Sequence, residues 1–129
     1  MRRRLALVLL LALSVTVSGC AVVLIAAGAA AGGAAVVWHA GWLRTTIPEP
    51  IERVHKAATA TLQDLKVTVD RDEQEGITAI VEGLLPDGRR AIVKTKTLAD
   101  KQTQTRIHVG FLGDQDLSLR ILEQMKKRL

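Results

Sequence analysis

The N-terminal third of this chain is almost free of charge, and this feature constrains the fold more than any other. Residues 1–43 contain only three charged side chains, the arginines at positions 2–4, whereas residues 44–129 carry the other 28. The same 43 residues hold half of all the apolar side chains, 31 of 62. The chain therefore divides into an apolar N-terminal segment and a C-terminal part large enough for one small domain.

Residues 1–19 have the three parts of an export signal. Arg2, Arg3 and Arg4 form a positive start, residues 5–17 form an apolar stretch rich in leucine, and two small residues follow. The apolar stretch is too short for a convincing membrane span. We therefore expect residues 1–19 to be a signal peptide. Its removal would take away three arginines and lower the net charge from +5 to +2.

The only cysteine, Cys20, directly follows Val17-Ser18-Gly19. This site resembles the lipobox of bacterial lipoproteins, which implies cleavage between Gly19 and Cys20. The resemblance also implies that Cys20 carries a diacylglycerol on its thiol and an acyl chain such as palmitate on its amine. Ala21 follows where an aspartate would favour the inner membrane, so in a Gram-negative host we expect the periplasmic face of the outer membrane. The alternative is a free thiol in an uncleaved membrane helix.

The uncharged stretch from Ala21 to Trp38 is rich in alanine, glycine and valine. Two interpretations compete. The one that we favour is a tether over residues 20–35 between the lipid and the domain, because alanine and glycine contribute little transfer energy. The other is a membrane helix that associates with itself through Gly28 and Gly32, whose spacing lets two helices approach closely.

Residues 36–129 are expected to form a single α+β domain. Apolar residues recur at spacings of three and four in two segments, which predicts one helix from Ile51 and another after Asp114. Asp114 is expected to cap the second helix. Extended structure is expected at 36–47, and further strands at 67–70, 77–85, 90–98 and 103–110, with a charged turn at 72–76.

The resulting order is strand, helix, four strands, helix. Short turns such as Pro86-Asp87-Gly88 join antiparallel neighbours. We therefore expect an antiparallel meander of about five strands. Each helix has one apolar stripe to bury, which places both helices on one face of the sheet.

No motif in the sequence indicates catalysis, a metal or a cofactor. There is no glycine-rich phosphate loop and no nucleophile elbow. His39, His55 and His108 have no ligand partner at metal-binding spacing on their own elements. Asp70, Asp72, Glu73 and Glu75 are acidic neighbours but lack the spacing of a calcium loop, and we expect a solvated turn. The prediction is a protein that is not an enzyme.

One sheet face is the best candidate for a docking surface. Strand alternation places the side chains of Arg90, Lys94, Lys96, Arg106 and His108 on the face away from the helices. We favour a merely solvated face, and the functional alternative is a docking face for an acidic envelope partner. That partner would be a protein, a lipid headgroup or a polymer. Nucleic acid is not expected, because the export signal would remove the chain from it and no base-stacking aromatics are expected.

Several motifs carry a resemblance that covers nearly the whole chain. They are the lipobox, the Ala/Gly/Val run after it, Pro86-Asp87-Gly88-Arg89, the segment Val109 to Asp114, and Leu119-Arg120-Ile121-Leu122. Together they resemble a family of small bacterial lipoproteins catalogued as a domain of unknown function. The resemblance implies an envelope location and this fold, and it adds nothing about chemistry. We expect a lipid-anchored accessory or binding module of the envelope. The alternative is a structural membrane component that oligomerises through Gly28 and Gly32.

Overall fold

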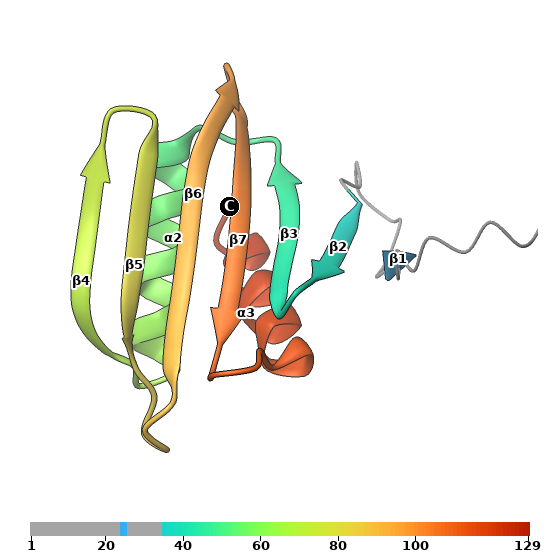
Figure 1. Ribbon diagram of the computed structural model, residues 1–129. Coiled ribbons are helices and arrows are strands. Elements are labelled where there is room, and N and C mark those ends of the chain that lie inside the picture. The colour runs from blue at the N-terminus through green and yellow to red at the C-terminus, as the bar shows by residue number, and fades with distance from the viewer. Residues whose placement is uncertain (1–23, 26–34) are drawn as a thin grey trace, which may run out of the picture.

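The computed structural model describes residues 24–25 and 35–129, which form seven strands and two helices (Figure 1). The strands are β1 (Leu24–Ile25), β2 (Val36–His39), β3 (Trp42–Ile47), β4 (Thr68–Glu75), β5 (Thr78–Leu84), β6 (Arg90–Ala99) and β7 (Gln102–Val109). The helices are α2 (Ile51–Asp64) and α3 (Gln115–Lys127). The α+β class is therefore as predicted.

All seven strands form one antiparallel sheet in the order β1-β2-β3-β7-β6-β5-β4. Strands β4 to β7 form the predicted meander. The prediction that the whole sheet is a meander is wrong, because β3 pairs with β7 and not with β4. Helix α2 carries the chain from β3 to β4 at the far edge of the sheet (Figure 1). This crossover places β3 beside β7, the last strand of the chain.

The predicted number of about five strands is too low. Residues 36–47 form two strands, β2 and β3, joined by a tight turn at Ala40 and Gly41. Both turn residues have positive φ, 49° and 80°, as a two-residue hairpin with the twist of a sheet requires. The turn was missed because alanine is an unusual residue at positive φ. The short strand β1, which pairs with β2, was not expected either.

The strand predicted at 67–70 is also longer than expected, and the predicted charged turn at 72–76 is wrong. Strand β4 runs to Glu75, and its acidic residues pair with β5, with Asp72 opposite Val81 and Glu73 opposite Ile80. A charged strand is stable here because β4 is the last strand of the sheet, and the edge of β4 that has no neighbouring strand faces solvent. Charge on such an edge also opposes pairing with another chain.

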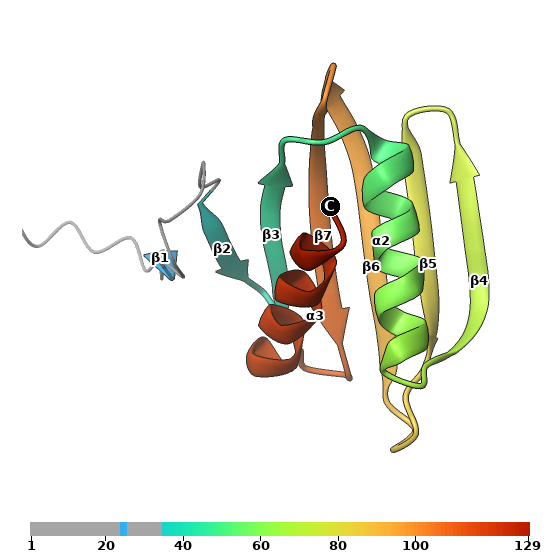
Figure 2. The same cartoon turned by 180° about the vertical axis from the view of Figure 1, so that it is seen from behind.

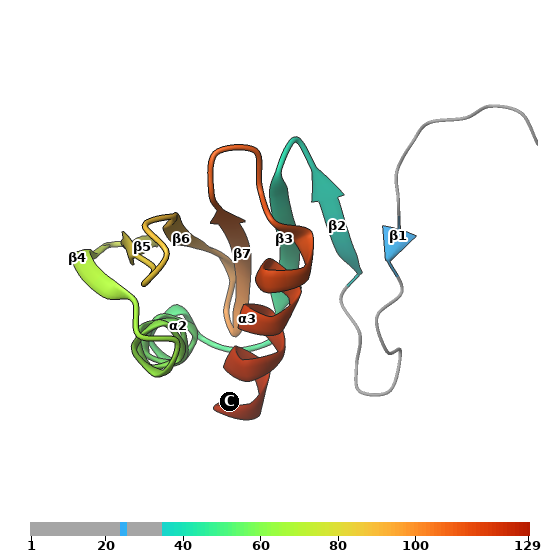
Figure 3. The same ribbon diagram turned by 90° about the horizontal axis from the view of Figure 1, so that it is seen from below.

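Both helices cover the same face of the sheet, as predicted (Figures 2 and 3). Helix α2 lies over β4, β5 and β6, and α3 lies over β7 and β3. Asp114 caps α3 as expected, since its carboxylate accepts a hydrogen bond from the Leu117 N–H at 3.0 Å. The core between the layers is made of fully buried aliphatic side chains, among them Leu43, Val54, Leu62, Val81, Val93, Ile107, Val109, Ile121 and Met125. Neither helix of the described residues has the length and apolar character needed to span a bilayer.

Candidate functional site: the open face of the sheet

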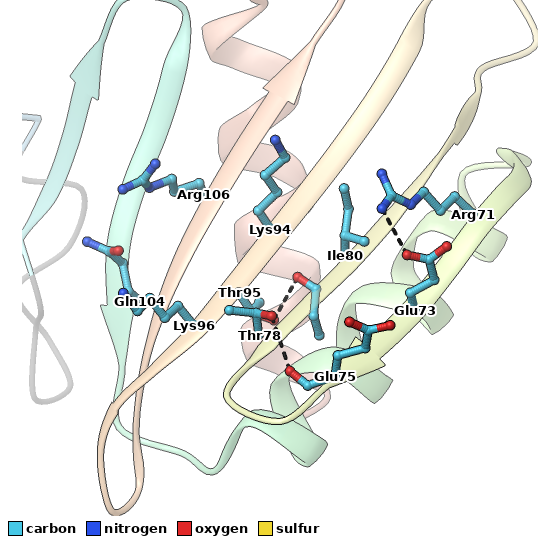
Figure 4. Close-up of a pocket in the computed structure, with 11 residues that line it drawn as sticks. Arg71, Glu73, Glu75, Thr78, Ile80, Lys94, Thr95, Lys96, Gln104 and Arg106 are labelled. Atoms are coloured by element: carbon cyan, nitrogen blue, oxygen red, sulfur yellow. Dashed lines mark hydrogen bonds and ion pairs between the residues drawn. The ribbon is translucent and has the colours of Figure 1, made fainter.

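The sheet face opposite the helices carries a shallow groove of about 420 Å³ (Figure 4). Strand alternation builds it, because every second residue of β4 to β7 points away from the core. The groove is lined by Arg71, Glu73, Glu75, Thr78, Ala79, Ile80, Lys94, Thr95, Lys96, Gln104 and Arg106. We call this surface the open face; it also includes Trp42 and Arg44 on the neighbouring strand β3.

A row of three cations crosses the open face. Arg106 on β7 lies directly opposite Arg44 on β3 and directly opposite Lys94 on β6. Side chains in such cross-strand positions have Cβ atoms about 4.5–5.5 Å apart, and like charges there destabilise the sheet. Lys96 lies on the same strand and face as Lys94, one row further along, opposite Gln104. The register therefore concentrates positive charge at the centre of the sheet.

Acidic side chains do not neutralise this row. Six arginines or histidines of the described residues form ion pairs with carboxylates, and none of these is Arg44, Lys94, Lys96 or Arg106. The rest of the chain contains no aspartate or glutamate that could serve instead. The Nε atom of Arg44 is buried and has no hydrogen-bond partner among the described residues. The four side chains thus keep their charge available for an external anion.

The β4 side of the groove is acidic, and one of its two carboxylates is paired with a cation. The Arg71 guanidinium donates a hydrogen bond to Glu73 at 2.8 Å. This bond lowers the pKa of the Glu73 carboxyl and raises the pKa of Arg71, with the opposite charges adding to both effects. Glu75 lies one row further along β4. The open face therefore has a cationic centre and a mixed edge.

Trp42 contacts Lys94, the cation at one end of the row. Its ring stacks on His108 with centroids 4.8 Å apart, and the Lys94 ammonium lies 5.3 Å from the Trp42 ring centroid. The His108 Nδ1 lies 2.7 Å from the Gly41 carbonyl oxygen, which can only accept, so Nδ1 carries the proton. The cation–π contact holds Lys94 without neutralising its charge.

The predicted docking residues separate into two groups. Lys94, Lys96 and Arg106 lie together on the open face, as the alternation predicted. Arg90 does not belong to the cationic centre, because both of its terminal nitrogens bond Asp70, at 3.1 and 3.2 Å. Glu82 lies 3.6 Å from Arg90 and so adds to that pair. His108 is committed to Trp42 and Gly41.

Sequence reasoning missed Arg44 and Trp42. Both alternate with Leu43 and Thr45, whose side chains are buried, so the pattern within β3 assigns them to the open face. The pattern does not reveal that β3 lies beside β7. That pairing depends on the α2 crossover, which joins segments far apart in the sequence.

The two other histidines, His55 and His39, do not line the groove. His55 on α2 contacts Asp72 on β4 at 2.6 Å and joins the helix to the edge strand. His39 is exposed on β2. No group of three or more potential metal ligands occurs within residues 24–25 and 35–129. The predicted lipidation and cleavage site at Gly19 and Cys20, and the glycine pair Gly28 and Gly32, lie outside the described residues.

The fold and the open face define a two-layer α+β domain whose helix-free sheet surface is cationic at its centre. A model of the family described as "Protein of unknown function (DUF3568)" matches residues 4–128, and the chain belongs to this family. The comparison with curated proteins gave no match.

Proposed function

We propose that this chain is a lipid-anchored lipoprotein of the bacterial envelope whose domain is a non-catalytic binding module. Cys20 would carry the lipid, and the periplasmic face of the outer membrane is the proposed location. The open face would bind an acidic partner in the envelope. The lipobox-like sequence before Cys20 supports the anchor, and the cation row supports the binding surface.

The observation that carries the binding function is the register that places Arg44, Arg106 and Lys94 at directly opposite positions on neighbouring strands. Such a row does not stabilise the sheet, since each pair of like charges at opposed positions lowers the free energy of unfolding. An acidic group placed across the row would remove the repulsion and form charge-assisted hydrogen bonds with the two guanidinium groups. The groove in front of the row gives such a group room on the surface.

The anchor is tested by metabolic labelling with palmitate and by the mass of the mature chain. The wild-type chain should incorporate label and begin at Cys20, whereas Cys20→Ser should do neither. A wild-type chain that retains residues 1–19 and takes up no label would contradict the anchor.

The binding surface is tested by photo-crosslinking in living cells. Ile80 lies in the groove directly opposite Lys94, so a photoreactive amino acid at position 80 reports on the bound partner. The crosslinked product should disappear in Lys94→Glu with Lys96→Glu. The matched control is Lys56→Glu with Lys101→Glu, which makes the same change of charge at two exposed positions outside the groove. Equal loss of product in both double variants would contradict a specific docking face.

A further inference from the structure

The connection between β7 and α3 presents two large apolar side chains to solvent. Phe111, the only phenylalanine of the chain, is 97% exposed, and Leu112 beside it is 82% exposed. Isolated apolar side chains on a surface need no explanation, whereas two adjacent ones of this size make a continuous exposed apolar patch. We call these two residues the apolar tip.

The apolar tip is held in place by the backbone around it. The Gly110 N–H donates a hydrogen bond to the Arg90 carbonyl at 2.8 Å on one side. On the other side Asp114 is fixed by Leu117 and by the Arg89 guanidinium, at 3.0 and 2.7 Å. The tip is therefore a fixed projection, because the connection has little freedom to fold back and bury the two side chains.

The turn at Ala40 and Gly41 lies at the same corner of the sheet as the apolar tip. The turn between β2 and β3 packs against the tip, since a Cβ atom on Gly41 would lie 2.6 Å from the Leu112 carbonyl oxygen. Figure 3 shows this turn beside the connection between β7 and α3. Trp38 and Trp42 flank this turn but lie on opposite faces of the sheet. Trp38 lies opposite Leu43 and packs against the core, whereas Trp42 lies on the open face below Lys94.

The N-terminal chain approaches the domain from the same edge. Leu24 in β1 pairs with Val37 in β2, so the chain is attached to the outer edge of β2 at this point. Cys20 precedes Leu24 by four residues, a reach of at most about 14 Å. An acylated Cys20 therefore holds the bilayer close to β2, whose far end leads into the turn that contacts the apolar tip.

We propose that Phe111 and Leu112 insert into the surface of the lipid bilayer to which Cys20 is anchored. This inference rests on the proposed anchor but not on the proposed acidic partner. A bilayer is the occupant because the lipidated residue is within reach of this corner and because two fixed apolar side chains fit an interfacial region. Contact through the corner leaves the open face free.

The test uses the full lipidated chain in vesicles of phosphatidylcholine, a neutral lipid that gives the cation row no net negative surface to bind. Leu112→Cys carries an environment-sensitive fluorophore on its thiol. Cys20 does not react when it is acylated, so labelling at Cys20 would reveal failure of the anchor separately. The matched control is Leu98→Cys, an exposed apolar position, 52% accessible, near the opposite end of β6.

The label at position 112 should shift its emission to the blue, lose its quenching by iodide and gain quenching by spin-labelled lipid. The label at position 98 should do none of these, and adding Phe111→Ser should reverse the shift at position 112. Equal spectra at the two positions would overturn the proposal. A shift that appears only in native membranes would overturn it in favour of a protein partner. A shift that grows with protein concentration without lipid would overturn it in favour of a second copy.

Discussion

Lys94 on β6 lies directly opposite Arg106 on β7, and neither side chain has a carboxylate within ion-pair distance among the described residues. Arg106 has a second cation, Arg44, on its other side. Arg90 on the same face as Lys94 is bonded to Asp70 instead. The positive charge of the open face is thus concentrated at cross-strand positions beside the groove, where repulsion between the cations lowers the stability of the sheet.

Replacing the central cation should therefore stabilise the sheet. We expect Arg106→Thr to raise the free energy of unfolding by about 0.2–1 kcal/mol, since it removes two unfavourable cross-strand pairs. The difference from the wild type should shrink at high salt, because surface charges are then screened. Urea denaturation at low and high salt measures both effects. Gln104→Thr, on the same face of β7, is the control for the change to threonine without a change of charge. A lower stability of Arg106→Thr than of Gln104→Thr would show that the cations do not repel one another.

The stability of the domain should fall in acid because of Asp114, the residue that caps α3. The pKa of Asp114 is lowered by the hydrogen bond from the Leu117 N–H and then by Arg89. The pKa of Asp114 is lower in the folded than in the unfolded chain. The stabilisation by its ionised carboxylate is therefore fully present when the pH is above the ordinary pKa of a carboxyl group. It is lost as the pH falls through the lowered pKa. Asp114→Ala should cost about 0.5–2 kcal/mol at neutral pH.

Asp114→Asn separates the cap from the charge. Asparagine is as good a cap as aspartate, so this variant should keep the cap and lose the interactions of the charge with the helix N-terminus and with Arg89. The ion pair with Arg89 is partly exposed, and its contribution should be small. Denaturation curves between acid and neutral pH should show the wild type and Asp114→Asn converging in acid. A gap that stays constant with pH would contradict the role given to the Asp114 charge.

Local signals predicted most of the helices and one face of the sheet. The stripe of Leu117, Ile121 and Met125, with Asp114 before it, is readable because a helix and its cap involve neighbours in the sequence. The alternation in β6 likewise placed Lys94 and Lys96 on the open face. Positions that depend on pairing between strands far apart in the sequence could not be predicted from local patterns.

The distance of Arg44 from Arg106 in the sequence explains why the complete cation row was not predicted. Their cross-strand position depends on β3 pairing with β7, which follows from the α2 crossover and from no local pattern. The bond between Arg90 and Asp70 was missed for a related reason. It depends on an irregularity in the pairing of β4 with β5 between Val69 and Arg71, next to Asp70.

The glycines around the apolar tip should differ from those in open turns. Gly113 and Gly88 have nearly equal positive φ, 90° and 87°, but different surroundings. A Cβ atom on Gly113 would lie 2.5 Å from the Gly41 carbonyl oxygen, whereas a Cβ atom on Gly88 would meet nothing within 4 Å. Gly88→Ala should cost about 1–2 kcal/mol from its backbone conformation alone.

Gly113→Ala should cost clearly more than Gly88→Ala, because it adds a collision with the β2–β3 turn. Hydrogen exchange should also show faster exchange in β2 and β3 for Gly113→Ala and no such change for Gly88→Ala. Equal losses of stability in the two variants would mean that the contact between Gly41 and Gly113 is not tight in solution.

Two buried threonines on β7 should respond in opposite directions to the same substitution. Thr103 and Thr105 are both fully buried. The Thr103 hydroxyl donates a hydrogen bond to the Glu49 carbonyl at 2.7 Å, whereas the Thr105 hydroxyl has no partner among the described residues. Burying a hydroxyl without a hydrogen bond costs about 1–3 kcal/mol. Valine has a similar shape without the hydroxyl.

Thr105→Val should therefore raise the free energy of unfolding by about 1 kcal/mol. Thr103→Val should lower it by about 0.5–1.5 kcal/mol, because the bond that ties β7 to the segment before α2 is lost. Chemical denaturation of the two variants and the wild type gives both values, and each variant is the control for the other. A loss of stability in Thr105→Val would show that its hydroxyl finds a partner in solution, such as a buried water between the sheet and the helices.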